Sequence, residues 1–331
     1  MLWCLTLLTA GLLAGCAVQG QLHNKTMIRG FNALQHKNMA WDKPASRHSF
    51  KRMVQLGANA VVLVPFLEQD SPTSVRVRRS DAVTMDQLQA AVNYAHEYGL
   101  KIILKPQVLV ADSWAGEIDH DQPQQWHVWF NSYSQHMLEY ARFASVHGVD
   151  AFVIGTELSR AANQVDWPGL IKRVRTVYSG QLTFAAHNVA GVKAFRYWHQ
   201  LDAVSLTLYP SLGLSGEREE MRRYVEATVQ NLKLAVEHID RPLWVLEIGM
   251  PSAQGASLKP WQWQHLKQAK VDLGLQKNAL DIWLDALDKP WVSGVFIWAW
   301  YSDDHSGGSK DTDYTPQHKP AESIVRRYWR L

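Results

Sequence analysis

Two glutamic acids each close a run of apolar residues, a position where a carboxyl group is costly to bury. Glu157 ends the run that begins at Ala151, and Glu247 ends the run that begins at Leu243. Buried acids are usually paired with a cation or kept for chemistry, so a structural ion pair is the alternative for either residue alone. Two facing carboxyls suit cleavage of a glycosidic bond, in which one protonates the leaving oxygen and the other attacks the anomeric carbon or activates water. A separation of ~5 to 5.5 Å would indicate retention of configuration, and a wider one inversion.

These acids belong to a series of eight short apolar runs that alternate with amphipathic stretches, a pattern typical of parallel βα units. Eight units in one chain favour a single (β/α)8 barrel over an open doubly wound sheet, and no Gly-x-Gly-x-x-Gly follows any run. The carboxyl ends of barrel strands converge on one mouth, so the fourth and seventh runs would bring Glu157 and Glu247 face to face. The runs are 30–34, 58–67, 101–108, 151–157, 181–188, 203–210, 242–249 and 292–300.

The segments between the runs have the spacing and the ends of helices. Thr84 and Gln87 form the sequence pattern of a capping box, and Gly99 provides a left-handed stop for the same helix. Apolar residues recur at helical spacing in two further segments, which we expect to dock on the outside of the sheet. Their apolar positions are Trp126, Trp129, Phe130, Tyr133, Met137 and Tyr140, and Met221, Val225, Leu232 and Val236.

Composition restricts the classes of function. The chain has 331 residues, 47% of them hydrophobic, and its 34 Lys and Arg against 31 Asp and Glu leave a charge of only +3 without a long basic run. This balance argues against a nucleic-acid partner. No linker rich in Pro, Gly or Ser divides the chain, so we expect one domain over residues 30–331. The 15 Trp are more than a core needs, and flat apolar rings are one kind of surface that binds sugars.

Other polar and aromatic residues at the expected strand ends are candidates for contacting a sugar. Trp298 and Trp300 alternate with Ala299, so both should point to the same side of the eighth strand, with at least one forming the floor of the sugar site and a core role open for Trp300. Four further residues could donate or accept hydrogen bonds with sugar hydroxyls, although a structural role is equally open to them. They are Asn32, Lys105, His187 and Asn188.

Together these motifs resemble glycoside hydrolase family 113, one of the clan A retaining glycosidases, over residues 30 to about 321. The motifs are Ile-Gly-Thr-Glu-Leu at 154–158, Leu-Glu-Ile-Gly at 246–249, Phe-Ile-Trp-Ala-Trp at 296–300, Leu-Lys-Pro at 104–106, Asp-Tyr-Thr-Pro at 313–316 and Lys-Pro-Ala-Glu at 319–322. The resemblance implies a TIM barrel that cleaves β-1,4-mannan-like polysaccharide or oligosaccharide by double displacement. It implies Glu157 as acid/base, Glu247 as nucleophile, and Tyr209 as a hydrogen-bond donor to the nucleophile.

One position departs from the clan pattern. Most clan A enzymes resemble one another in having Asn before the acid/base, where it touches the 2-hydroxyl of the sugar, whereas this chain has Thr156, as family 113 does. The departure leaves open how the 2-hydroxyl is recognised.

The N-terminal stretch indicates export. Residues 1–15 have the length and apolar character of a signal peptide, and Leu-Ala-Gly-Cys at 13–16 resembles a bacterial lipoprotein signal. This predicts a lipidated Cys16, a tether over residues 16–29 and a membrane-anchored envelope protein, although the segment before the apolar stretch lacks the usual Lys or Arg. An uncleaved anchor is the alternative. A tethered enzyme also suggests a glycan of the cell envelope, or an exported one, as substrate.

Other chemistries lack their motifs. The 14 His include no His-Glu-x-x-His, and no Gly-x-Ser-x-Gly elbow exists, so we expect neither a metal nor another cofactor nor a serine nucleophile. Two alternatives to a hydrolase remain: a non-catalytic surface lipoprotein that binds glycans, and a transglycosylase that uses the same residues. We expect the protein to be a monomer.

Overall fold

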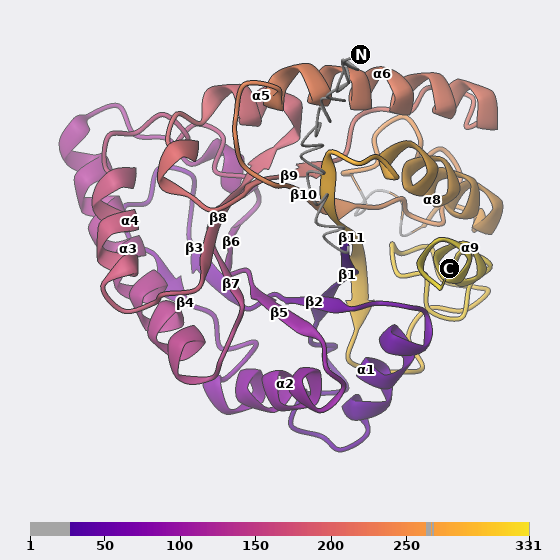
Figure 1. Cartoon of the computed structure of the whole chain (residues 1–331), viewed down its shortest axis with the longest axis horizontal. Helices are drawn as coiled ribbons and strands as arrows, with labels where there is room; N and C mark the ends of the chain where they lie inside the picture. The colour runs from indigo at the N-terminus through magenta and orange to yellow at the C-terminus, as the bar shows by residue number, and fades with distance from the viewer. Residues whose placement is uncertain (1–26, 263–265, 267, 331) are drawn as a thin grey trace, which may run out of the picture.

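Eight parallel strands close into a barrel, which confirms the (β/α)8 architecture (Figure 1). The computed structural model describes residues 27–262, 266 and 268–330. The predicted signal peptide, the lipidated Cys16 and most of the tether lie outside the described residues. Around the barrel each strand pairs with its neighbours and β11 returns to β1. The strands are β1 (Ile28–Leu34), β2 (Ala60–Leu63), β5 (Lys101–Leu104), β7 (Ala151–Thr156), β8 (Gln181–His187), β9 (Val204–Leu208), β10 (Leu243–Ile248) and β11 (Val292–Tyr301).

Helices surround the barrel (Figure 1). The second of them has the expected capping box, in which the Gln87 backbone N–H donates to the Thr84 hydroxyl and the Thr84 N–H donates to the Gln87 side chain. Gly99 follows with a left-handed φ of 67°. The helices are α1 (Ser46–Gln55), α2 (Met85–Glu97), α3 (Pro123–Val146), α4 (Trp167–Arg175), α5 (Asn188–Ala194), α6 (Arg218–Val236), α8 (Leu273–Leu287) and α9 (Ala321–Trp329), with 3-10 turns η1 (Ala115–Glu117) and η2 (Trp198–Gln200).

The apolar runs are continuous because both faces of each barrel strand are covered. Along β2, for example, Val62 belongs to the cluster inside the barrel, whereas Val61 and Leu63 belong to the larger cluster between barrel and helices. Small and branched side chains such as Ala151 and Val153 fill the interior. The aromatic residues predicted on α3 and three of the four apolar residues predicted on α6 are part of the outer cluster, and the fourth, Val236, packs against it.

Two of the expected strands are each divided at a proline. The run 58–67 breaks at Pro65 into β2 and β3 (Phe66–Gln69), and the run 101–108 breaks at Pro106 into β5 and β6 (Gln107–Val110). Proline has no N–H for the strand ladder, which explains both breaks. β3 then pairs with β6 on one side and with β4 (Arg78–Arg79) on the other, which forms a separate three-stranded sheet.

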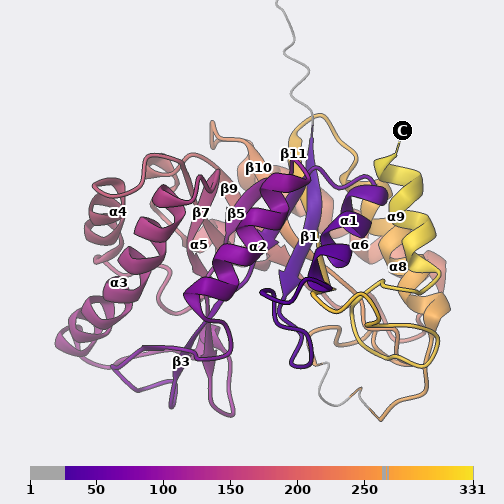
Figure 2. The same cartoon turned by 90° about the horizontal axis from the view of Figure 1, so that it is seen from below.

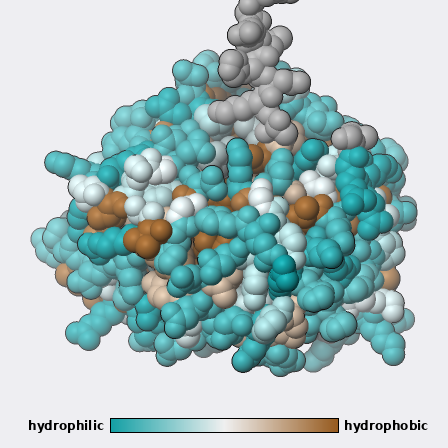
Figure 3. All heavy atoms as spheres, turned by 60° about the horizontal axis from the view of Figure 1, so that its bottom comes forward, coloured by the Kyte–Doolittle hydropathy of each residue, from teal (hydrophilic) through white to brown (hydrophobic). Residues whose placement is uncertain are grey.

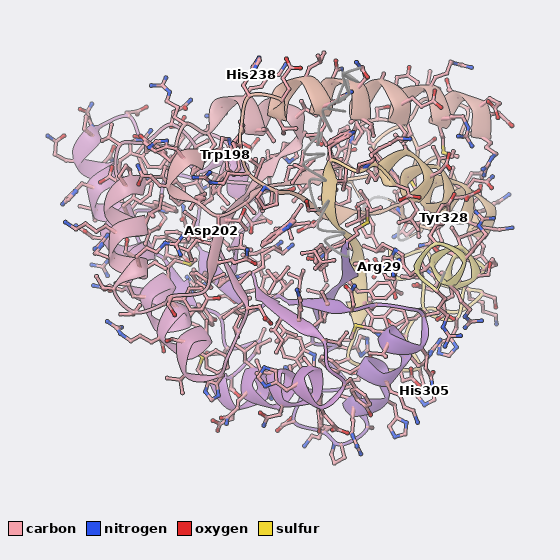
Figure 4. All side chains as sticks on the ribbon, in the orientation of Figure 1. Arg29, Trp198, Asp202, His238, His305 and Tyr328 are labelled. Carbon is pink, nitrogen blue, oxygen red and sulfur yellow. The ribbon has the colours of Figure 1, made fainter. Side chains whose placement is uncertain are left out.

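The two ends of the barrel differ. In Figure 2 β1 begins at the upper end, whereas β3 projects from the lower end, where the barrel strands finish. Near the upper end the Arg29 guanidinium donates to the Tyr328 carbonyl of α9 at 3.4 Å, and both residues are labelled in Figure 4. On the face seen in Figure 3, hydrophobic residues are scattered among hydrophilic ones. Within the described part of the chain, no helix has both the length and the apolarity needed to cross a bilayer.

Candidate active site

A cavity of about 740 Å³ lies at the carboxyl ends of the barrel strands, and both glutamates line it. Four of its residues come from β6 and the loop that follows, and others from the ends of β8, β9, β10 and β11. Its lining consists of Gln107, Asp112, Ser113, Trp114, Glu157, His187, Asn188, Tyr209, Pro210, Ser211, Glu247, Trp261, Gln262, Trp298 and Tyr314. The sequence prediction that Glu157 and Glu247 share one mouth is therefore met.

Glu157 stands just beyond β7 in a left-handed backbone conformation, with a φ of 54°. Its N–H donates to the Ala185 carbonyl of β8, which fixes this turn. Asp112 and Asn188, which also line the cavity, have φ values of 52° and 53°. A left-handed non-glycine residue costs ~1 to 3 kcal/mol, and such residues concentrate at functional sites.

Neighbouring strands supply the partners of the Glu157 carboxyl. The Thr207 hydroxyl of β9 donates to its Oε1 at 2.5 Å, and Nδ1 of His187, at the end of β8, lies 3.2 Å from the same oxygen. Asn188 supports this arrangement, since its side-chain nitrogen lies 2.9 Å from His187 Nε2 and its carbonyl oxygen accepts from the Tyr209 N–H at 3.0 Å.

Glu247 is buried on β10 and accepts hydrogen bonds from three side chains. Oε1 accepts from Lys105 Nζ and, at 2.9 Å, from Gln107 Nε2; Oε2 accepts from the Tyr209 hydroxyl at 2.9 Å. Lys105 is fully buried, and its ammonium lies 5.2 Å from the ring centroid of Trp298. Donors directed at both oxygens favour the carboxylate form of Glu247.

Burial raises the pKa of both acids, whereas nearby cations and hydrogen-bond donors lower it. Burial, with a contribution from the charge of Glu157, raises the pKa of Glu247 above its ordinary value, against the lowering effect of Lys105 and Tyr209. Burial also acts to raise the pKa of Glu157, but His187, Thr207 and Lys105 outweigh it and leave that pKa below its ordinary value. Because the pKa of one acid depends on the charge of the other, the two titrate as a pair.

Burial also shifts the pKa values of two donors of Glu247. Burial, reinforced by the charges of Glu247 and Glu157, raises the pKa of Tyr209 well above its ordinary value, so this phenol remains a donor. Burial lowers the pKa of Lys105, and the attraction of Glu247 opposes that shift.

Trp298 lines the cavity as predicted, but the prediction that Trp300 points to the same side is wrong. The pairing of β11 with β1 shifts between Asn32↔Trp298 and Ala33↔Trp300, so that Ala299 is an extra residue and the alternation of sides is interrupted. Trp300 is fully buried on the outer face of the barrel, where its indole N–H donates to the Ser49 hydroxyl at 2.7 Å. Trp300 therefore packs in the hydrophobic core and does not line the cavity.

Two polar candidates lie beneath the cavity rather than on its surface. Asn32 is fully buried, and its amide donates to the Leu246 carbonyl at 2.8 Å and to the Ile297 carbonyl at 3.4 Å, which ties β1 to β10 and β11. Lys105 is buried against Glu247. Neither is among the residues that line the cavity, so we correct the prediction that they contact sugar hydroxyls. His187 and Asn188 do line it.

Sequence reasoning missed several lining residues, including Gln107 and three aromatic residues, Trp114, Trp261 and Tyr314. The Trp114 ring lies 4.7 Å from that of His187 and packs over Gly116, where an added Cβ would stand 2.1 Å from the indole. The long connection after the third predicted strand was a signal for Trp114. Nothing in the local sequence marks Gln107, because its place depends on the break at Pro106.

Comparison with known proteins agrees with this architecture. The family model of Glycoside Hydrolase Family 113 matches residues 30–319. A search of curated proteins found no match.

Several of the similar solved structures are β-mannanases of this family. A structure of a GH113 β-1,4-mannanase is 26% identical, with a TM-score of 0.81, over 92% of this chain and 99% of that one. The GH113 β-mannanase AaManA from Alicyclobacillus acidocaldarius, in complex with ManMIm, is 28% identical with a TM-score of 0.80, over 92% and 96% of the two chains. The match to the family extends over most of the barrel and includes both glutamates, and from it we conclude that this chain belongs to Glycoside Hydrolase Family 113 and is a glycoside hydrolase.

Proposed function

We propose that the protein is a retaining β-glycosidase that cleaves a β-1,4-mannan-like glycan, with Glu247 as nucleophile and Glu157 as acid/base. The observation that carries the proposal is the placement of both carboxyls in one cavity, with the partners of Glu247 directed at both of its oxygens. The similarity to β-mannanases, at 25 to 28% identity, supports mannan as the substrate class. Trp298 and the exposed rings of Trp114 and Trp261 offer faces for sugar rings.

In the first step the Glu247 carboxylate attacks the anomeric carbon while Glu157 donates its proton to the glycosidic oxygen. The bond to the leaving sugar breaks, the sugar departs with the proton, and an ester joins Glu247 to the remaining glycan. In the second step the Glu157 carboxylate takes a proton from water, and the resulting oxygen attacks the same carbon. The ester breaks, Glu247 returns to its carboxylate, and two inversions leave the β configuration unchanged.

The assignment of roles rests on the hydrogen-bond donors. Taken alone, the pKa shifts place a proton more readily on Glu247 than on Glu157. Only Glu247, however, is bonded to an ammonium, an amide and a phenol that would stabilise a carboxylate during attack. Since the acids titrate as a pair, the reactive form is the one in which their shared proton is on Glu157.

A test combines product stereochemistry with labelling of the nucleophile. NMR of the first product formed from β-1,4-mannooligosaccharide should show the β anomer, and a 2-deoxy-2-fluoro β-mannosyl fluoride should add one glycosyl group to a peptide that contains Glu247. A first-formed α anomer, or label on another residue, would overturn double displacement. The absence of turnover on mannan and on envelope polysaccharides would instead favour the glycan-binding alternative. Transfer to added sugar in place of water would identify a transglycosylase.

We also propose that the enzyme is exported and held at the cell envelope by a lipid on Cys16. Support comes from the Leu-Ala-Gly-Cys motif and from the fold, since β1 begins at the end of the barrel opposite the cavity. A chain attached at that end leaves the mouth open to a glycan.

A further inference from the structure

The three side chains that donate to Glu247 differ in the hydrogen bonds that they can form with a sugar. Lys105 is fully buried and does not line the cavity. Tyr209 donates its only proton to Glu247 Oε2 and leaves the sugar just an oxygen lone pair. Gln107 gives one N–H to Glu247 Oε1, and its second N–H and its carbonyl oxygen make no hydrogen bond to another described residue. Of these three, Gln107 alone can both donate to and accept from a hydroxyl.

The position of Gln107 brings that amide close to the reacting carbon. In a conformation poised for attack, a carboxylate oxygen lies ~3 to 3.5 Å from the anomeric carbon. The amide nitrogen is 2.9 Å from Glu247 Oε1. The two ring neighbours of the anomeric carbon are the ring oxygen, which carries no proton, and C2, which carries a hydroxyl. A group that both donates and accepts therefore suits the hydroxyl on the C2 side.

Thr156 is less accessible to a sugar than Gln107. It precedes Glu157 in the chain, but its hydroxyl is buried, and it lines only a smaller adjoining hollow and not the main cavity. Gln107, by contrast, lines the main cavity and also an adjoining hollow of about 300 Å³, which Glu157 borders as well. Gln107 thus lines the main cavity together with both acids and lines the adjoining hollow together with Glu157.

We propose that Gln107 recognises the hydroxyl at C2 of the sugar whose glycosidic bond is cleaved, and thereby sets the preference for an axial or an equatorial hydroxyl there. The inference rests on the proposed hydrolysis and names the residue that determines its specificity. The backbone holds Gln107 in place, since its N–H donates to the Pro65 carbonyl at 3.0 Å and β6 pairs with β3. Specificity would then be carried by the added sheet, outside the barrel wall.

The test compares Gln107→Met with the unmodified enzyme on two substrates. One is an activated aryl β-1,4-mannobioside, and the other is its analogue without the 2-hydroxyl on the sugar next to the aryl group. Loss of the hydrogen bond to Glu247 should lower kcat/KM on both substrates alike. We expect the additional loss of the bond to the 2-hydroxyl to make the fall on the hydroxylated substrate ~10- to 100-fold greater than the fall on the 2-deoxy analogue. The manno over gluco preference should fall in parallel.

Gln262→Met is the matched control. Gln262 lines the same cavity without a hydrogen bond to Glu247, so its replacement should leave the ratio of the two substrates unchanged. Gln107→Asn keeps the amide but shortens the side chain by one methylene, so it should show the same selective loss. This variant replaces Gln107→Met in the test if the Met variant does not fold.

Equal losses on both substrates would overturn the inference and leave Gln107 as a positioning residue for Glu247. If the unmodified enzyme cleaves neither substrate nor any mannooligosaccharide, the proposed function itself fails, and these two outcomes are distinct.

Discussion

A buried lysine lies behind the carboxyl group that we propose attacks the sugar. Lys105 has no exposed surface, and its ammonium pairs with Glu247. Breaking a buried pair from one side costs ~3 to 5 kcal/mol because the remaining charge has no partner. Glu247 would respond by taking up a proton, so the charge of Lys105 controls whether the nucleophile is ionised.

Lys105→Met should therefore change the pH dependence of the enzyme. Without the ammonium, the pKa of Glu247 rises further, because Lys105 is the main influence that lowers it. The proposed nucleophile must be ionised, so the acidic limb of the kcat/KM profile should move to higher pH, with a loss of ~100-fold or more near neutral pH. Lys105→Arg keeps the charge and should move the limb less. An acidic limb that stays in place or moves to lower pH would show that Lys105 does not act through Glu247.

Glu157→Gln should separate substrates by their leaving groups. An amide cannot protonate the glycosidic oxygen, so cleavage of mannooligosaccharides should fall ~10²- to 10⁴-fold, whereas formation of the glycosyl ester from a dinitrophenyl glycoside should change little. Pre-steady-state release of dinitrophenol measures that step directly. If both classes of substrate lose rate equally, Glu157 is not the acid.

At the scale of elements, turns and breaks bring the site together. Pro65 and Pro106 end two barrel strands early and send the chain into the added sheet. The loop after β6 then carries Trp114, whose indole packs over Gly116 and beside His187. A side chain at Gly116 would meet this ring, so the glycine determines where the exposed aromatic face lies.

Gly116→Ala should weaken the binding of oligosaccharides by displacing Trp114. Its Cβ would stand 2.1 Å from the indole, too close for the ring to stay in place. An aromatic contact is worth ~0.5 to 1.5 kcal/mol, so KM for a mannooligosaccharide should rise about 2- to 10-fold.

Gly169→Ala is the control for this glycine substitution. Nothing lies within 4 Å of a Cβ at Gly169, which is in α4. The change should leave KM unaltered and raise stability by up to ~1 kcal/mol, because alanine favours a helix. An unchanged KM in Gly116→Ala would mean that Trp114 does not bind the glycan.

At the scale of the whole molecule, the start of β1 lies at one end of the barrel (Figure 2), and the cavity lies at the other. Cys16 precedes Ile28 by 12 residues. An extended chain of that length reaches ~40 Å, so a lipid on Cys16 would hold the barrel near a membrane without covering its mouth.

Cys16→Ser should release the protein from membranes while leaving hydrolysis of soluble mannooligosaccharides unchanged. A single acyl chain gives only marginal membrane binding, and stable anchoring needs the full lipid modification of the cysteine. Fractionation of cells, together with incorporation of labelled palmitate, measures both parts of the prediction. A serine variant that still sediments with membranes would favour an uncleaved anchor.

Local sequence determined much of this protein. Each barrel strand follows from its apolar run, the start of α2 from Thr84 and Gln87, and the placement of Glu157 and Glu247 from the rule that barrel strands end at a common mouth. Such features depend on the order of residues along one element, which is why they can be predicted from the chain alone.

Tertiary structure decided how neighbouring elements meet. Trp298 and Trp300 lie on opposite sides because the pairing of β11 with β1, strands at the two ends of the chain, shifts by one residue. Lys105 turned out to be the partner of Glu247, and Gln107 reached the same carboxyl from a strand outside the barrel. Register and side-chain pairing are set by the packing of residues distant in sequence, so the pattern within a single strand does not contain them.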